Sequence, residues 1–126
     1  MIHRTARGSA PLEFVGVGAL TTLVVLAILQ IAVVSHVRAV VLDSAAAGAA
    51  HGALADSSLR AGVERTRALL NIGVASDLIA KVSGSTGTVA SRRVAIVKVD
   101  YRVPAFALWI PTAVGSVSAR AFVEVP

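Results

Sequence analysis

Residues 8–34 read GSAPLEFVGVGALTTLVVLAILQIAVV, a run in which Glu13 is the one charged side chain. The next charged residue is Arg38, so residues 14–37 carry no formal charge. As an α-helix this segment spans roughly 36 Å at about 1.5 Å per residue, and the hydrocarbon core of a bilayer is about 30 Å thick. We therefore expect a transmembrane helix whose membrane-spanning part covers about residues 14–34.

The composition of the whole chain agrees with one small domain on a membrane anchor. Of the 126 residues, 56% are hydrophobic and 15% are charged, and the mean hydropathy is +0.78, which is too apolar for an ordinary soluble domain. The chain has no cysteine, so a domain outside the cytoplasm would depend on its core without disulfides. Arg4 and Arg7 precede the apolar segment, and the positive-inside rule places that end in the cytoplasm.

The helix is expected to continue to about residue 56 with a change in composition. Its second half is rich in small residues, including Ala45, Gly48, Ala49 and Gly52. The two alanines stand four residues apart, as do the two glycines, so each pair shares a helix face. Small residues at this spacing allow close approach of another element. That element is either the chain's own sheet, which we favour, or a helix of another subunit.

The rest of the chain predicts a short helix and then strands. Capping side chains at residues 56–58 precede a stripe of helical period, formed by Leu59, Gly62, Val63, Thr66, Leu69 and Leu70. Alternation of period two predicts strands at residues 95–103 and 117–125, with a weaker strand at 76–82. Residues 83–87 are expected to form a turn, and residues 104–115 an irregular connection.

These elements predict an α+β fold. It consists of a long N-terminal transmembrane helix that serves as a spine, a short amphipathic helix and a small antiparallel sheet of about three strands. The expected organisation is a basic leader at residues 1–8, the helix at residues 9–56 and a head at residues 57–126. A turn-like stretch, Gly-Ser-Ala-Pro, is expected at residues 8–11. A sheet of this size is stable only if a helix covers one of its faces.

This pattern resembles a known family. A leader that ends in Gly8, a Glu at the fifth position after it, a hydrophobic helix, an Ala-rich continuation and a small β region are similar to the TadE-like pseudopilins of the tight-adherence (Tad) type IV pilus. The resemblance rests on residues 8–14, on Val37-Arg38 and on residues 43–50 (DSAAAGAA), and it covers about half of the chain. The β region agrees only in general character. The major Tad pilin is much shorter than this chain, which indicates a minor subunit.

The resemblance implies that a prepilin peptidase cleaves between Gly8 and Ser9, which makes Glu13 the fifth mature residue. Gly8 places no side chain in the way of the peptidase. An unpaired carboxylate near lipid is costly, so Glu13, beside Phe14, would pair with the cationic α-amino group of Ser9 in a neighbouring subunit and set the axial register. The alternative is that Glu13 lies among the headgroups near Arg7.

The role implied by the family is structural. A minor pseudopilin is stored in the bacterial cytoplasmic membrane with its head outside the cytoplasm, and it primes, caps or supports a pilus that serves adhesion, secretion or DNA uptake. The implied partners are the membrane, the prepilin peptidase, the major and other minor pilins and the Tad assembly platform.

Residues for catalysis or ligand binding are scarce. His3, His36 and His51 are far apart in the sequence, no zinc spacing is possible without cysteine, and no serine has a plausible base nearby. We expect no enzymatic activity, no metal, no cofactor and no small-molecule substrate. The arginines of the head stand among acidic residues without interleaved aromatic residues, so we expect no direct contact with nucleic acid.

One apolar loop of the head is a possible contact site. Phe106 and Trp109 lie in this loop, which either packs on the protein itself or forms an exposed patch for lipid or another subunit. Two rival hypotheses concern the whole chain: an unprocessed single-pass membrane protein whose head binds an envelope partner, and a secreted protein with a cleaved signal peptide. Glu13 and the length of the apolar run argue against the signal peptide.

Overall fold

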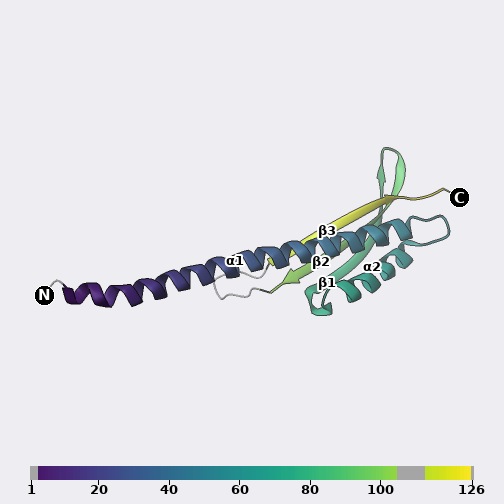
Figure 1. The fold of residues 1–126 in the computed structure, drawn as a ribbon. Helices are drawn as coiled ribbons and strands as arrows, with labels where there is room; N and C mark the ends of the chain where they lie inside the picture. The colour runs from purple at the N-terminus through teal and green to yellow at the C-terminus, as the bar shows by residue number, and fades with distance from the viewer. Residues whose placement is uncertain (1–2, 105–112, 126) are drawn as a thin grey trace.

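The computed structural model describes residues 3–104 and 113–125, and within these ranges the side chains of residues 9–75, 77–104 and 113–125. Its elements are the helices α1 (His3–Gly52) and α2 (Leu59–Gly73), the 3₁₀ helix η1 (Ser76–Leu78), and the strands β1 (Ile79–Val89), β2 (Arg92–Val103) and β3 (Ala113–Phe122). Figure 1 shows α1 as a long rod whose N-terminal half projects from a head formed by the other elements. The expected α+β, pilin-like fold is confirmed.

The three strands form one antiparallel sheet in the order β1-β2-β3. Val97 of the central strand pairs with Gly84 of β1 and with Ala119 of β3. A two-residue turn connects β1 to β2, and both of its residues, Ala90 (φ 51°) and Ser91 (φ 64°), have positive φ. Positive φ at both positions is typical of the tight hairpin turns whose twist matches that of the flanking strands.

The prediction for β1 was wrong in position. The weak strand expected at residues 76–82 and the turn expected at residues 83–87 are replaced by η1 and by one strand that continues to Val89. Cross-strand pairing along β2 overrides the local preference of the glycines for a turn. Gly87 is accommodated because the side chain of Ile96 fills the space beside it, where an added Cβ would lie 3.1 Å from Ile96 Cδ1.

The core lies between one face of the sheet and the two helices. On α1 its members recur at every fourth position and include two of the small residues; on β2 they alternate. The buried residues of this cluster are Val37, Val41, Ala45, Ala49, Leu70, Val82, Val97, Val99, Tyr101, Val103, Val117 and Ala119. The helical stripe predicted for α2 is confirmed, because Gly62, Thr66 and Leu70 are buried.

The ends of the helices differ from the prediction in detail. The predicted cap of α2 is confirmed: Ser58 is the N-cap, and its Oγ accepts a hydrogen bond from the amide of Ala61 at 3.2 Å. By contrast, α1 ends at Gly52 rather than near residue 56. It also includes residues 8–11, where a turn-like stretch was expected. Extending an existing helix costs far less than starting one, so Gly8 and Pro11 do not interrupt it.

At the other end of the chain, β3 is shorter and shifted relative to the prediction. It begins at Ala113, inside the expected connection, and ends at Phe122 instead of residue 125. Beyond it, the amide of Glu124 donates a hydrogen bond to the carbonyl of Ala53 at 2.8 Å. This bond draws the chain away from the strand ladder and towards the end of α1. Phe106 and Trp109 lie outside the described residues.

Candidate functional site

The most distinctive surface of the protein is the N-terminal arm, which we define as residues 9–29 of α1. Nearly all of its side chains are exposed, including Leu12 (72%), Phe14 (80%) and Ile28 (60%). The helix from Ser9 to Gly52 is long and apolar enough to cross a membrane, and only 6% of its most apolar window is buried within the protein. A core helix of a soluble domain would be mostly buried, so this surface requires another apolar environment.

Among the described residues, Gln30 is the first residue of α1 that is buried. This residue is 5% exposed, and its side-chain amide nitrogen donates a hydrogen bond to the carbonyl oxygen of Pro104 at 3.2 Å. Val33 and Val34 pack against the core from the next turn. The span expected at residues 14–34 therefore ends about one turn earlier. Residues 9–29 measure about 31 Å at about 1.5 Å per residue, which matches a hydrocarbon core of about 30 Å.

The polar side chains within the arm have partners in the helix itself. Thr21 Oγ1 donates to the carbonyl oxygen of Val17 at 2.8 Å, and Thr22 Oγ1 donates to that of Gly18 at 2.9 Å. Groups that are satisfied in this way enter a lipid environment at little cost, because no water is available there to bond them. The arm is thus suited to lipid in its backbone and in these side chains.

Ser9, Glu13 and Phe14 all lie on the exposed surface of the arm. Because Ser9 and Glu13 are four residues apart in one helix, they share a face. Gly8 lies in the same helix, one turn before Leu12. The proposed processing site and the register residues therefore occupy the far end of the arm, away from the head (Figure 1).

The four small residues of α1 are used within the chain. Ala45 and Ala49 are fully buried in the core with the sheet, as favoured from the sequence. Gly48 and Gly52 instead face α2. An added Cβ on Gly62 of α2 would lie 2.6 Å from the carbonyl oxygen of Gly48 and 3.0 Å from Cα of Gly52. These glycines permit backbone contact between the two helices, and packing of this face on another subunit is replaced by the contact with α2.

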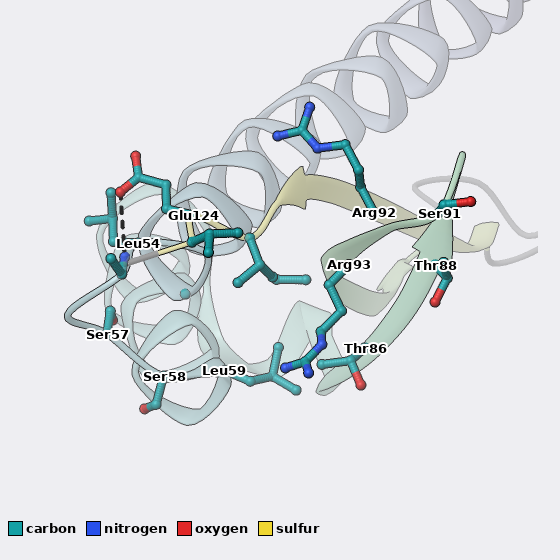
Figure 2. Close-up of a pocket in the computed structure, with 15 residues that line it drawn as sticks. Leu54, Ser57, Ser58, Leu59, Thr86, Thr88, Ser91, Arg92, Arg93 and Glu124 are labelled. Carbon is teal, nitrogen blue, oxygen red and sulfur yellow. Dashed lines mark hydrogen bonds between the residues drawn. The ribbon is translucent and has the colours of Figure 1, made fainter.

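A pocket of about 790 Å³ lies at the end of the head that is distant from the arm. It is enclosed by the connection between α1 and α2, by the β1–β2 hairpin and by residues 123–125. In Figure 2 the guanidinium group of Arg93 lies between Leu59 and Thr86, whereas Arg92 points away from them. Because three segments far apart in the chain form this pocket, no local pattern in the sequence could indicate it.

The chemistry of this pocket does not include a catalytic set. Its carboxylate, Glu124, is 3.4 Å from the amide of Ala55, from which it accepts a hydrogen bond. The other polar lining side chains are hydroxyl groups and the two arginines, Arg92 and Arg93. Among the described side chains, those of residues 9–75, 77–104 and 113–125, no three of His, Cys, Asp or Glu are grouped so as to hold a metal ion.

Gln30 is the residue of functional interest that the sequence interpretation missed. Gln30 carries the one amide side chain in the uncharged run of residues 14–37, and this contrast with its mostly apolar neighbours could have indicated it. Its role depends on Pro104, which lies 74 positions away, so only the folded chain reveals it.

Comparison of the chain with protein-family models, with curated proteins and with solved structures gave no match. The geometry of the site is that of an apolar arm as long as the hydrocarbon core of a bilayer is thick. This arm is continuous with the part of α1 that packs in the core of the head.

Proposed function

We propose that this chain is a minor pseudopilin of the TadE-like class. A prepilin peptidase removes residues 1–8, and the processed subunit supports the assembly of a Tad-type type IV pilus by packing its N-terminal helix. The observation that carries the proposal is that the exposed, apolar arm is about as long as a bilayer's hydrocarbon core is thick, and that the head packs on α1 from Gln30 onward. A subunit of this form can be stored in a membrane and later placed in a filament through the same apolar surface.

The sequence around the scissile bond supports processing. Pro11 lies inside α1 and has no amide hydrogen, so the carbonyl of Arg7 cannot receive the usual helical hydrogen bond from four residues later. This weakens the helix beside the Gly8–Ser9 bond. Local opening of the helix there would give the peptidase an extended backbone, and Gly8 presents no side chain to obstruct it.

The charges that precede the arm support the orientation. Arg4 and Arg7 precede the arm, and cationic residues before a span favour the cytoplasmic side. The head, which follows the arm, then lies outside the cytoplasm. Its proposed partners are the prepilin peptidase, the assembly platform, and the major and other minor pilins; its direct contacts are with proteins and lipid.

Glu13 is the residue proposed to set the register between subunits. In a filament, its carboxylate would pair with the freed α-amino group of Ser9 in a neighbouring subunit. The Glu13 side chain is exposed, so it is accessible to a partner from another molecule or to the lipid headgroups. An ion pair away from water favours the one axial position at which both charges are matched.

Ordinary secretion fits this fold poorly. A signal-peptide cut near residue 40 would remove Val37, which is 4% exposed in the core, and Gln30, which is bonded to the end of β2. Loss of these contacts would expose the C-terminal end of β2 and the core residues next to it. The remaining alternative is an unprocessed single-pass protein whose head binds an envelope partner.

The proposal is tested by the intact mass of the protein isolated from membranes of cells with and without the prepilin peptidase. We expect a chain that starts at Ser9 only when the peptidase is present. Gly8→Leu should block this cleavage, whereas Gly16→Leu, a matched change within the arm where nothing lies within 4 Å of the added Cβ, should leave it intact. A fully functional chain that keeps residues 1–8 would overturn the proposal.

A further inference from the structure

The face of the sheet that is turned away from α1 and α2 forms a separate surface, which we call the outer face. Along β2 the core residues alternate with outward-facing ones, and the pairing of the strands places particular residues of β1 and β3 beside these. The polar and charged members of the outer face are Lys81, Ser83, Ser85, Arg92, Lys98, Asp100, Arg102, Ser116, Ser118 and Arg120.

The folded chain concentrates its net positive charge on this face. Among residues 9–104 and 113–125, the outer face holds five cationic side chains and one carboxylate, Asp100. The other surfaces in these ranges hold five cationic side chains and six carboxylates, so they are close to neutral. In the linear sequence the two groups are interspersed, and the separation arises from the alternation of the strands.

The cations are close enough to act together. Lys98 is flanked across the sheet by Ser83 and Ser118, and Asp100 is paired with Lys81. Neighbouring strands lie about 4.8 Å apart, and residues two apart on a strand are about 6.7 Å apart. The nearest cation pairs, such as Lys98 with Lys81 and Lys98 with Arg120, are diagonal neighbours about 7–8 Å apart. This separation is close to the Debye length of about 8 Å at physiological salt, so their potentials add in part.

From this charge separation we propose that the outer face binds a linear anionic polysaccharide. Exposed lysine and arginine side chains would contact its carboxylates, and the serine hydroxyl groups between them would hydrogen-bond to its sugar hydroxyl groups. The choice of a polysaccharide as the polyanion rests on the proposed function, which places the head outside the cytoplasm, where such polymers occur.

The composition of the face disfavours a protein partner and single-stranded nucleic acid. Interfaces between proteins have a buried apolar centre. On the outer face, Lys98 is flanked by Ser83 and Ser118, and the apolar side chains Val94, Ile96 and Phe122 gather towards the β1–β2 hairpin. Binding of single strands depends on aromatic rings that stack with bases. On the described part of this face, the aromatic ring is that of Phe122, and Arg92 lies over it at 4.7 Å from the ring centroid.

The direction of the face disfavours lipid headgroups. The strands of the sheet run alongside α1, so the outer face is roughly parallel to the helix (Figure 1). When the arm crosses a bilayer, this face stands upright from the membrane surface and is open from the side. A long polymer can reach it there, whereas a flat layer of headgroups cannot cover it.

The test uses the full chain in detergent micelles, with fluorescently labelled polygalacturonate as the probe and anisotropy as the readout. We expect binding at 150 mM NaCl that is lost at 500 mM NaCl. Lys98→Gln with Arg120→Gln should weaken it by about 10- to 30-fold, since each cation near an anionic surface contributes up to about fivefold. The matched control is Arg60→Gln with Arg65→Gln, which removes the same charge from exposed positions of α2 and should change the affinity by less than about twofold.

Three results would overturn the inference. The first is the absence of binding at 150 mM NaCl. The second is an equal loss in both double variants, which would show attraction to overall charge rather than to the outer face. The third is tighter binding of duplex DNA or polyglutamate than of polygalacturonate. Because the assay uses purified protein, these outcomes do not depend on cleavage after Gly8, which the mass measurement tests separately.

Discussion

The side-chain amide of Gln30 donates a hydrogen bond to the carbonyl oxygen of Pro104, with a nitrogen–oxygen distance of 3.2 Å. It joins the middle of α1 to the residue that directly follows β2. This bond lies at the level where, among the described residues, α1 first becomes buried by the head.

Replacement of Gln30 should separate stability of the head from insertion into the membrane. In Gln30→Leu the carbonyl oxygen of Pro104 loses this donor, so we expect the free energy of unfolding of the head to fall by about 1–2 kcal/mol. Membrane insertion should be unchanged, because leucine is more apolar than glutamine. Pulse proteolysis in urea and detergent measures the stability, and carbonate extraction measures the insertion. The matched control is Ile31→Leu, at a position that is 66% exposed, which should leave both unchanged.

A side chain at Gly62 should destabilise the packing of α1 against α2. In Gly62→Ala the new Cβ would meet the carbonyl oxygen of Gly48 at 2.6 Å, and both groups belong to backbones that cannot rotate aside. We expect a loss of about 3 kcal/mol from this overpacking. Gly18→Ala, where the added Cβ has nothing within 4 Å, is the control and should leave the stability of the head unaltered. Equal stability of the two variants would contradict the close approach of the helices.

Tyr101 and Gly115 should be energetically coupled, because they form a cross-strand pair in which the ring covers the glycine. An added Cβ on Gly115 would lie 2.6 Å from Cζ of Tyr101. We expect Gly115→Ala alone to cost about 1–3 kcal/mol, and to cost much less in a Tyr101→Leu background. A double-mutant cycle of unfolding free energies measures the coupling; additive costs would show that the ring does not depend on the glycine.

The exposed carboxylate of Glu13 should be needed for assembly but not for processing. In Glu13→Gln the side chain keeps its size and loses its charge, so the proposed pair with the α-amino group of a neighbouring Ser9 disappears. We expect normal cleavage after Gly8, with incorporation into filaments reduced by about tenfold or more, since an unmatched charge away from water is strongly unfavourable. Immunoblots of membrane and sheared-filament fractions separate the two effects. The headgroup alternative predicts normal incorporation instead.

Several parts of the fold were predictable because they depend on neighbours in the sequence. The long apolar run indicated the helix that became the arm, the helical stripe from Leu59 to Leu70 indicated α2, and Ser58 indicated its first turn. The alternation around Val97 and Val99 indicated the buried face of β2. Each of these features depends on residues that are close together in the sequence: a helical or alternating period, or a cap at the start of a helix.

The errors occurred where a distant segment overruled a local preference. Gly84 and Gly87 favour a turn, yet pairing with β2 holds them in a strand, and the turn falls on Ala90 and Ser91. Gly48 was assigned with the alanines to the sheet, but its partner is α2, because the helix rotates by about 100° per residue and presents the glycines to a different side.

The sequence by itself determined that the chain has an apolar helix of membrane length, a small α+β head and a Glu at the start of the apolar run. These properties follow from composition and from short-range periodicity. Only the tertiary structure decided that the head begins at Gln30, that the glycines of α1 serve α2, and that the cationic side chains gather on the outer face. Each of these depends on which distant residues are brought together, and hydrogen bonds and close packing act over distances in space rather than along the chain.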